Sequence, residues 1–398
     1  MEHNNVFYHS VIALLSALAI CGCFSQPNVT IPDNDIGYDS GTLRNVQRIS
    51  DDGFGKTWVV ASNDGVSLLY NEMTMENIHN KKETTVNATI TNRVIYLRNA
   101  QVFAKTPTSV EVENSDKLII GNDVVFAPEI DVISIPKGMS AQDAANIHLA
   151  RFIKADASAP GVAAFYENGT NFIYSDAERG SRQLAKANVN NTSKTFITQN
   201  PVGQGDSYPS LRDGIIAFQT TINNQSRIII LREDGNSIKR NRQQSDGSIV
   251  TEDARQLNLG PGEQPSWHPT EDKVVFILDG NIMEMDIYAT QQTQIYGISN
   301  REKQEGVSCG LPSFTADGKY ILFLKRAKVT SYKQGKTEIP IHRTHLYRMN
   351  TDGSNITELT SGNLDITYYS ASKDDKVFFI SNAGNKTEIW SATITLGE

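Results

Sequence analysis

The stretch Pro312-Ser-Phe-Thr-Ala-Asp-Gly-Lys-Tyr-Ile-Leu-Phe323 decides the fold, because the chain repeats it. Related copies occupy 209–218, 265–276 and 369–379. A repeat of this length is one supersecondary unit that cannot bury its own apolar face. The copies must therefore pack against one another.

The spacing of the copies indicates the kind of unit. The aromatic residues that end them are separated by 53, 58, 47 and 56 residues, and they are Phe165, Phe218, Phe276, Phe323 and Phe379. Turns such as Asp279-Gly280 follow, and such pairs between β-rich runs favour hairpins because both residues need positive φ. Each unit then holds four short strands, which is typical of a propeller blade. We predict an all-β chain that forms a single β-propeller of four-stranded antiparallel blades.

The number of blades depends on the first half of the chain. Thr57–Gly65 followed by Ser67–Tyr70 is a further copy, and we assign Lys117–Phe126 with Val132–Ile135 to another unit. This gives seven blades. Six blades remain if the first half of the chain, where the repeat pattern is weak, holds one blade fewer. Arg93–Leu97 is either an eighth blade or an extra strand in a long second blade.

The chain ends predict how the ring closes. The last copy stops after Glu388–Ile394 and lacks a fourth strand, whereas Asn45-Val-Gln-Arg-Ile-Ser50 has that strand's pattern. We expect residues 45–50 to complete the last blade and so to pair the exposed edges of the sheet. The propeller domain is then 45–398.

Two segments interrupt the β pattern. Ser140–Asp143 resembles a helix N-cap with an acidic first turn, and apolar residues then recur at helical spacing. We expect a surface helix near 141–154. The polar loop 236–247 holds Lys239, Arg240 and Arg242, which we expect to be solvated.

The N-terminus predicts export. Val11–Ile20 is a short apolar region, and Ile20-Cys-Gly-Cys23 resembles a bacterial lipobox. Residues 1–22 are then a lipoprotein signal peptide, Cys23 is the lipid attachment residue, and 23–44 is a flexible tether. The first five residues lack the usual Lys or Arg. The alternative is ordinary signal cleavage, with a Cys23–Cys309 disulfide.

Charge and chemical motifs narrow the function. The formal net charge of −8 argues against nucleic acid as a partner. Gly306-Val-Ser-Cys-Gly310 matches the nucleophile-elbow pattern, but it continues into the repeat with no helix pattern after it, so we interpret it as a chance match. His342 and His345 precede a predicted strand and are not spaced as ligands. We expect no catalytic set, no metal and no cofactor.

The fourth residue of each Pro-Ser copy is the position most able to meet a ligand. Small polar residues there, such as Thr315 and Ser372, suit local turn capping. Arg212 and His268 depart from that type. Equivalent positions fall on one circle in a closed ring, so we predict that Arg212 and His268 lie near the channel mouth as weak ligand-binding candidates.

The copies at 265–273 and 312–319 resemble the repeat of TolB-like propellers, which are related to WD40-like repeats. The resemblance extends over about 205–395. It implies a ring that binds proteins, peptides or glycans without catalytic residues in the repeat. TolB has an α/β domain before its ring, and nothing between Cys23 and Asn45 corresponds to it, so we do not identify the chain as TolB itself.

The resulting hypothesis is a non-enzymatic binding or scaffold module, anchored by lipid to the cell envelope. Its partners would be an envelope protein, peptide or glycan, and the membrane through its N-terminal lipid. Phe24 and Ser25 after Cys23 favour the outer membrane, or the periplasmic face, of a Gram-negative bacterium. The alternative is an enzyme sited in the funnel, such as a metal-dependent polysaccharide lyase.

Overall fold

A computed structural model describes most of the repeat region and part of what precedes it. All described residues belong to the unit from Ile36 to Glu398. They are residues 43–50, 56–65, 67–79, 86–98, 107–108, 111–114, 117–120, 123–126, 135–136, 153–154, 162–167, 169–176, 181–188, 191–201, 204–243, 246–289, 291–334, 337–362, 364–373, 375–381 and 387–395.

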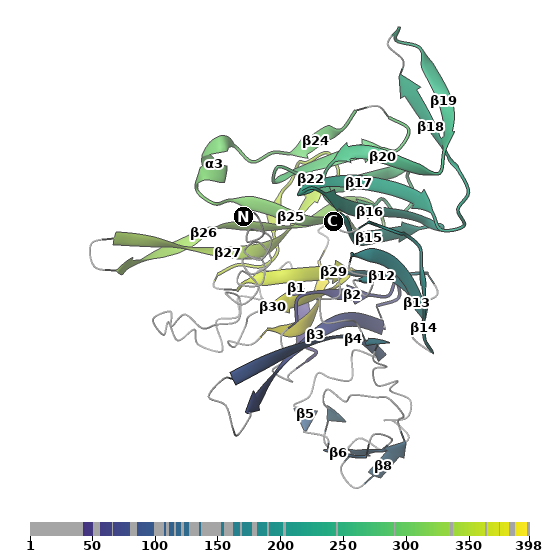
Figure 1. Cartoon of the computed structure of the whole chain (residues 1–398). Coiled ribbons are helices and arrows are strands. Elements are labelled where there is room, and N and C mark those ends of the chain that lie inside the picture. Colours follow the sequence, from purple (N-terminus) through teal and green to yellow (C-terminus); the bar gives the residue numbers. More distant parts are fainter. Residues whose placement is uncertain are drawn as a thin grey trace, which may run out of the picture. The chain divides into compact units, whose positions relative to one another are not determined.

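Six four-stranded antiparallel sheets form a closed ring within this part of the chain. The first strand of each sheet contacts the first strands of both neighbouring sheets. We number these sheets blades 1 to 6 in chain order, and most of their strands are labelled in Figure 1. The predicted all-β propeller of four-stranded blades is confirmed.

The strands of the first three blades are given from the centre outward. Blade 1 contains β2 (Val59–Ala61), β3 (Ser67–His79), β4 (Val86–Arg98) and β10 (Ile153–Lys154). Blade 2 contains β11 (Ala163–Phe165), β12 (Asn171–Asp176), β13 (Gln183–Asn188) and β14 (Asn191–Phe196). Blade 3 contains β15 (Gln204–Arg212), β16 (Ile215–Ile222), β17 (Gln225–Arg232) and β20 (Gln256–Pro261). A separate hairpin, β18 (Ile238–Gln243) and β19 (Ile249–Ala254), lies between β17 and β20 in the chain.

The other three blades follow the same order. Blade 4 contains β21 (Glu263–Trp267), β22 (Lys273–Leu278), β23 (Asn281–Asp286) and β24 (Thr293–Tyr296). Blade 5 contains β25 (Ser308–Phe314), β26 (Tyr320–Gln334), β27 (Thr337–Asn350) and β28 (Thr357–Glu358). Blade 6 contains β29 (Ile366–Ala371), β30 (Lys376–Ser381), β31 (Glu388–Ile394) and β1 (Leu43–Arg48).

The hydrophobic core lies between neighbouring blades. Phe276, Phe323 and Phe379, which end three of the repeat copies, are fully buried. Each belongs to an apolar cluster shared with the preceding blade. Burial of large aromatic side chains is the main favourable term in such packing. The repeat aromatics are therefore the residues that join one sheet to the next.

The N-terminal strand closes the ring, as the sequence predicts. β1 pairs antiparallel with β31, with Leu43 opposite Ile394 and Arg48 opposite Trp390. The strand covers 43–48 rather than 45–50. The backbone N–H groups of Ile49 and Ser50 still donate to the carbonyl of Ile389, at 2.7 and 3.3 Å.

The prediction of seven blades is wrong for the described residues. Blades 2 to 6 account for five regular sheets, and blade 1 is completed only by the two-residue strand β10. Arg93–Leu97 lies inside β4, so it extends a long blade and adds no eighth one. The 105-residue gap between Val60 and Phe165 suggested another unit, but it contains the long β3–β4 hairpin and two small sheets.

One of the small sheets contains Lys117–Phe126, the segment that the sequence assigns to a seventh blade. β6 (Glu111–Asn114), β7 (Lys117–Ile120) and β8 (Asp123–Phe126) form three strands that are hydrogen-bonded to no blade. β5 (Pro107–Thr108) pairs with β9 (Ile135–Pro136). A count based on period alone cannot distinguish such an insertion from a blade.

Helical structure differs from the sequence prediction. The end of the predicted 141–154 helix, Ile153–Lys154, is strand β10, and the rest of that segment lies outside the described residues. A short helix, α3 (Asn300–Gln304), begins with a capping box between Ser299 and Glu302. No helix within the described ranges is long and apolar enough to cross a membrane. The predicted signal peptide, 1–22, and most of the predicted tether, 23–44, lie outside those ranges.

Candidate functional site: the central cavity

The repeated proline marks a β-bulge in the innermost strand of three blades. The residues before proline, Tyr208, Gln264 and Leu311, have positive φ angles of 51°, 55° and 49°. In each strand the pairing register shifts at this point. A bulge leaves one residue outside the ladder, so proline's missing N–H is not lost from the sheet. The bulge turns these inner strands at equivalent places.

The serine after the proline joins one inner strand to the next. Ser210 Oγ accepts a hydrogen bond from the backbone N–H of Trp267 at 3.0 Å. Ser370 Oγ does the same for Ala61 across the joint between blades 6 and 1, also at 3.0 Å. Ser313 Oγ lies 2.9 Å from the phenol oxygen of Tyr369. The Pro-Ser repeat therefore encodes contacts between blades as well as strands.

These strands surround a central cavity of about 260 Å³. Its lining comes mainly from the first strands of all six blades, and the described residues that form it are uncharged. Hydroxyl and amide groups supply its polarity, and they include those of Tyr208, Gln264, Ser266 and Tyr368. The cavity thus presents hydrogen-bonding groups and aromatic faces without formal charge.

Two tyrosines give the cavity its distinctive chemistry. Burial raises the pKa of both Tyr208 and Tyr368, and in Tyr368 the nearby Tyr208 and Tyr369 add to the increase. Both phenols therefore stay protonated and keep a donor. Sequence reasoning missed both residues, although they occupy the repeat position directly before Pro-Ser or its Tyr369-Ser370 equivalent.

Most fourth-position residues of the repeat cap local turns. Thr315 Oγ1 accepts the N–H of Tyr320 at 3.1 Å, and Ser62 Oγ accepts that of Ser67 at 3.0 Å. Ser372 Oγ donates to the carbonyl of Lys376 at 3.3 Å. These hydrogen bonds agree with the turn capping that the sequence predicts for Thr315 and Ser372.

His268 occupies the same position with an imidazole in place of a hydroxyl. Its Nδ1 accepts N–H groups from Thr270 and Glu271, at 3.2 and 2.9 Å. The tautomer that these bonds assign carries its proton on Nε2, which donates to the Gly318 carbonyl at 3.2 Å. The ring also packs edge-on against Phe314, 4.6 Å between centroids. Both nitrogens thus bind backbone groups of blades 4 and 5.

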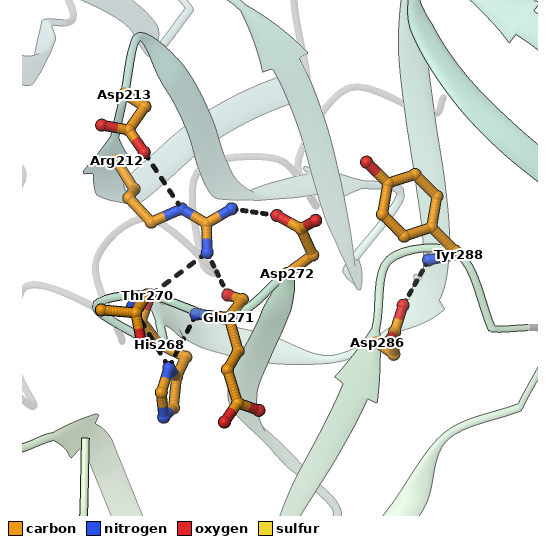
Figure 2. A network of polar contacts seen from close by, with 8 residues as sticks. All are labelled: Arg212, Asp213, His268, Thr270, Glu271, Asp272, Asp286 and Tyr288. Carbon is orange, nitrogen blue, oxygen red and sulfur yellow. Dashed lines mark hydrogen bonds and ion pairs between the residues drawn. The ribbon is translucent and has the colours of Figure 1, made fainter.

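Arg212 lies in the same network, across the joint between blades 3 and 4 (Figure 2). Its guanidinium pairs with Asp272, donates to the Glu271 carbonyl, and lies over the Trp267 ring. Its side chain is only 11% exposed. The structure therefore brings the two predicted ligand-binding residues together in an interblade contact. Their binding of a ligand stays a prediction.

The nucleophile-elbow pattern occupies a strand. Ser308 and Cys309 begin β25 and pair with Arg326 and Lys325 of β26, as expected for a chance match beside the innermost strand. Cys309 is buried, and burial raises the pKa of its thiol to about 12. This sulfur is therefore a poor nucleophile at neutral pH.

The two histidines of β27 have separate hydrogen-bond partners. His345 Nδ1 contacts Glu358 at 2.5 Å and its Nε2 contacts the Gly362 carbonyl at 3.2 Å. His342 Nε2 contacts the Glu305 carbonyl at 2.7 Å. Within the described part of the chain, no three His, Cys, Asp or Glu side chains gather as metal ligands would. Cys23, the predicted lipid attachment residue, lies outside the described residues.

Comparisons with known proteins find solved structures of low similarity to this chain. The chain matches no protein-family model and no curated protein. Among solved structures, a putative TolB from Agrobacterium tumefaciens is 11% identical, with a TM-score of 0.44 over 79% of this chain and 86% of that one. TolB from Acinetobacter baumannii is 9% identical, with a TM-score of 0.39 over 83% and 81%. An oligogalacturonate lyase from Vibrio parahaemolyticus is 12% identical, with a TM-score of 0.41 over 87% and 93%.

Proposed function

We propose that this protein is a non-enzymatic binding or scaffold module, anchored to the cell envelope by lipid at Cys23. Its TolB-like propeller would hold a protein, peptide or glycan partner at the central cavity. The observation that supports this proposal is the lining of that cavity, to which all six inner strands contribute uncharged side chains.

The lining favours binding over chemistry. General acid–base catalysis needs a titratable group within hydrogen-bonding reach of the substrate, and a catalytic metal needs imidazole or carboxylate ligands. Among the described residues, the cavity offers hydroxyls, two amides and phenols whose pKa burial raises instead. Such groups, with aromatic faces beside them, bind peptide amides or sugar hydroxyls through hydrogen bonds and stacking.

The binding site can be tested at Tyr368. Replacing this residue with the photo-crosslinking amino acid p-benzoylphenylalanine should link the full chain in membranes to its partner. The same replacement at Tyr288, which is 39% exposed and lies outside the cavity lining, is the matched control. Crosslinked product at Tyr368 alone supports the proposal. Equal products at both positions, or product only at Tyr288, would contradict it.

Tyr368→Phe sharpens this test because it removes only the hydroxyl. A hydrogen bond from this phenol to the partner is worth about 1 kcal/mol, so partner affinity should fall about fivefold. Binding that is unchanged in Tyr368→Phe, after crosslinking at Tyr368, would place the partner beside the ring face of this residue rather than its hydroxyl.

The lipid anchor is a separate part of the proposal. The Cys23→Ala chain should leave the membrane fraction of a Gram-negative host, while the unchanged chain should remain with the outer membrane. Mass spectrometry of the intact protein should show an acylated N-terminal cysteine. Unchanged partitioning of the Cys23→Ala chain would remove the anchor and leave the binding module in place.

The alternative is a metal-dependent enzyme in the funnel. It would require His and carboxylate groups that converge on the cavity, and three of the described histidines, His268, His342 and His345, bind other groups. Elemental analysis of the purified full chain distinguishes the two functions. A stoichiometric metal ion that is lost on substitution of two or more histidines would establish the alternative.

A further inference from the structure

Arg182 lies where blade 2 meets the innermost strand of blade 3. It directly precedes β13 and forms an isolated parallel bridge with Gly205 of β15. Its carbonyl accepts the backbone N–H of Asp206 at 3.1 Å and the side-chain amide of Asn200 at 2.9 Å. These bonds fix the backbone of Arg182 beside the strand that contributes Tyr208 to the cavity lining.

The side chain of Arg182 packs along this strand. A Cβ added to Gly205 would lie 3.5 Å from Arg182 Cβ and 3.9 Å from its Cδ, so the apolar stem covers the glycine. The residue is half-buried. Beyond the stem, the guanidinium interacts electrostatically with the phenol of Tyr208. Arg182 therefore lies at the edge of the central cavity, next to one of the residues that line it.

The Arg182 guanidinium has lost water without gaining a counter-ion. Among the described residues it forms no ion pair, and its electrostatic partner is the Tyr208 phenol. Burial lowers the pKa of the group, because the charged form is solvated less well there than in water. An unpaired charge away from water is costly, so arginines in such places are normally paired. A charge kept in this state is expected where a ligand supplies the missing anion.

The carboxylates nearby in the chain do not neutralise Arg182. Asp206 is 1% exposed, and burial raises its pKa, so it holds its proton more tightly than an exposed carboxyl does. Its carboxyl interacts with neutral side chains, which are Thr198, Asn200 and Thr220. Glu263 is exposed and acts on Tyr208 rather than on Arg182. The anion that Arg182 lacks must therefore come from outside the described part of the chain.

The phenol of Tyr208 supplies a second donor at the same edge. Gln264 Oε1 accepts the N–H of Leu311 at 2.6 Å, so the amide NH2 of Gln264 is the group that meets the Tyr208 oxygen. The phenol oxygen is then the acceptor of that contact, and its proton is left for another acceptor. Burial raises the pKa of Tyr208, so this proton stays in place at neutral pH. A guanidinium and a phenol O–H thus lie near each other, and both are donors.

We propose that Arg182 and Tyr208 bind a carboxylate of a peptide segment that enters the central cavity. This inference rests on the proposed function for the place of the ligand, and it adds the ligand's charge. A guanidinium binds a carboxylate through two parallel hydrogen bonds, and a phenol donates to the same anion. The described residues that line the cavity are uncharged, so they would hold the neutral part of the segment.

The size of the cavity favours a peptide over a glycan. Pockets that enclose a whole small-molecule ligand usually measure about 300 to 1,000 Å³. The central cavity, at about 260 Å³, is smaller. It suits the end of a peptide chain, or one acidic side chain, better than several sugar rings. The carboxylate is therefore that of a C-terminus or of an Asp or Glu side chain.

The test measures the melting temperature of the purified full chain with N-acetylglycine, a peptide-like carboxylate. At about 50 mM, compared with sodium chloride of equal ionic strength, it should raise the melting temperature by about 2 °C, because an anion that binds only the folded state stabilises it. N-acetylglycinamide lacks the charge and should have no effect. An equal shift with the amide would overturn the proposal. A larger shift with glucuronate than with N-acetylglycine would assign the carboxylate to a glycan and contradict a peptide.

Arg182→Met keeps the stem over Gly205 and removes the charge, so it should abolish the shift. The matched control is Arg255→Met, because Arg255 is exposed and precedes the same Gln-Leu pair in the sequence. It should keep the full shift. Equal shifts in the two variants would show that the carboxylate acts elsewhere, and would overturn the proposal.

A second readout excludes a structural role for the charge. In chloride alone, Arg182→Met should melt no lower than the unchanged chain, because it removes a half-buried charge that has no counter-ion. A clearly lower melting temperature would show that the guanidinium stabilises the fold, and would contradict a site kept for a ligand.

The outcome is separable from that of the proposed function. If the cavity holds no partner in cells, photo-crosslinking at Tyr368 fails, whereas N-acetylglycine still stabilises the purified chain through Arg182. If the carboxylate subsite fails, N-acetylglycine has no specific effect, although an uncharged partner is still crosslinked at Tyr368.

Discussion

The joints between blades and the seam that closes blade 6 hold the same ring in different ways. At the joints, Ser210 and Ser370 accept backbone N–H groups from the next inner strand. At the seam, Ser50 Oγ donates to Glu388 at 2.5 Å, and Lys56 Nζ lies 3.4 Å from the same carboxylate. The serine contacts at the joints are thus neutral hydrogen bonds, whereas the seam has a single buried charged cluster.

This difference explains what each part contributes to stability. Loss of one serine affects one joint, and the five others remain. The seam is formed once, by residues more than 330 positions apart, so its loss opens the ring. We therefore expect the largest effects at the seam and smaller ones at the joints.

Lys56→Met should have the largest effect. Lys56 and Glu388 side chains are both 0% exposed, and removal of one partner leaves an uncompensated buried charge that costs about 3 to 5 kcal/mol. Chemical denaturation should show that loss in the free energy of unfolding. Lys56→Met/Glu388→Gln should recover part of it, because no buried charge then remains. A loss below about 1 kcal/mol in the single variant would mean that the seam is no more sensitive than a joint.

Gly318→Ala should come next, because two effects combine. Gly318 has φ +73°, and an added Cβ would lie 2.6 Å from His268 Nε2 at the joint between blades 4 and 5. Gly214→Ala is the control, with φ +71° and no atom within 4 Å of the added Cβ. Both variants carry backbone strain of about 1 to 2 kcal/mol, and Gly318→Ala should lose about 1 kcal/mol more. Equal melting temperatures for the two variants would show that the His268 side chain can move away from the added methyl group without a loss of stability.

Ser210→Ala should have a smaller effect. It leaves the buried N–H of Trp267 without its acceptor, which costs about 1 to 2 kcal/mol. Ser266 occupies the equivalent repeat position and makes no such bond among the described residues, so Ser266→Ala should change the unfolding free energy by less than about 0.5 kcal/mol. If both substitutions lower the unfolding free energy equally, the serines stabilise their own strands, and the hydrogen bond between blades contributes nothing measurable.

Cys309→Ser should have the smallest effect on stability at neutral pH, and it should change how stability depends on pH above pH 9. Burial raises its thiol pKa from 9.0 to about 12, so the folded protein keeps a proton that the unfolded chain releases. Its contribution to stability is fully present below pH 9 and falls as pH rises from 9 toward 12. Cys309→Ser should reduce this pH dependence in denaturation curves. Rapid alkylation of native Cys309 by iodoacetamide at pH 8 would contradict a buried thiol.

The sequence predicted the parts of the molecule that repeat. The Pro-Ser copies located the innermost strands, the Asp279-Gly280 turn has both residues at positive φ, and the unpaired pattern at 45–50 located the closing strand. These features depend on local chemistry or on resemblance between copies. The same comparison placed Arg212 and His268 at one end of the inner strands, where they meet in one network.

The sequence could not predict features that occur once. The small β6–β7–β8 sheet contains short apolar runs like those of a blade, so its sequence was counted as part of a seventh blade. The Lys56–Glu388 pair connects distant positions outside the repeat, so no local pattern indicates it. Tyr208 and Tyr368 did share a repeat position, but tyrosine beside a buried strand is most often core, and only the structure shows that these two line the cavity.

Crosslinking of β1 to β31 tests the closed ring most directly. In a chain whose native cysteines are replaced by Ser, Arg44→Cys/Thr393→Cys places two thiols at paired positions of the seam. A short bismaleimide should join these two thiols within one chain in high yield. The control is Arg44→Cys/Ser248→Cys, whose second thiol lies in the turn of the β18–β19 hairpin, and it should not be crosslinked. Intramolecular crosslinking of the first pair but not the second is the predicted result. No crosslink at 44–393 in the folded protein would contradict the six-bladed ring closed by its N-terminal strand.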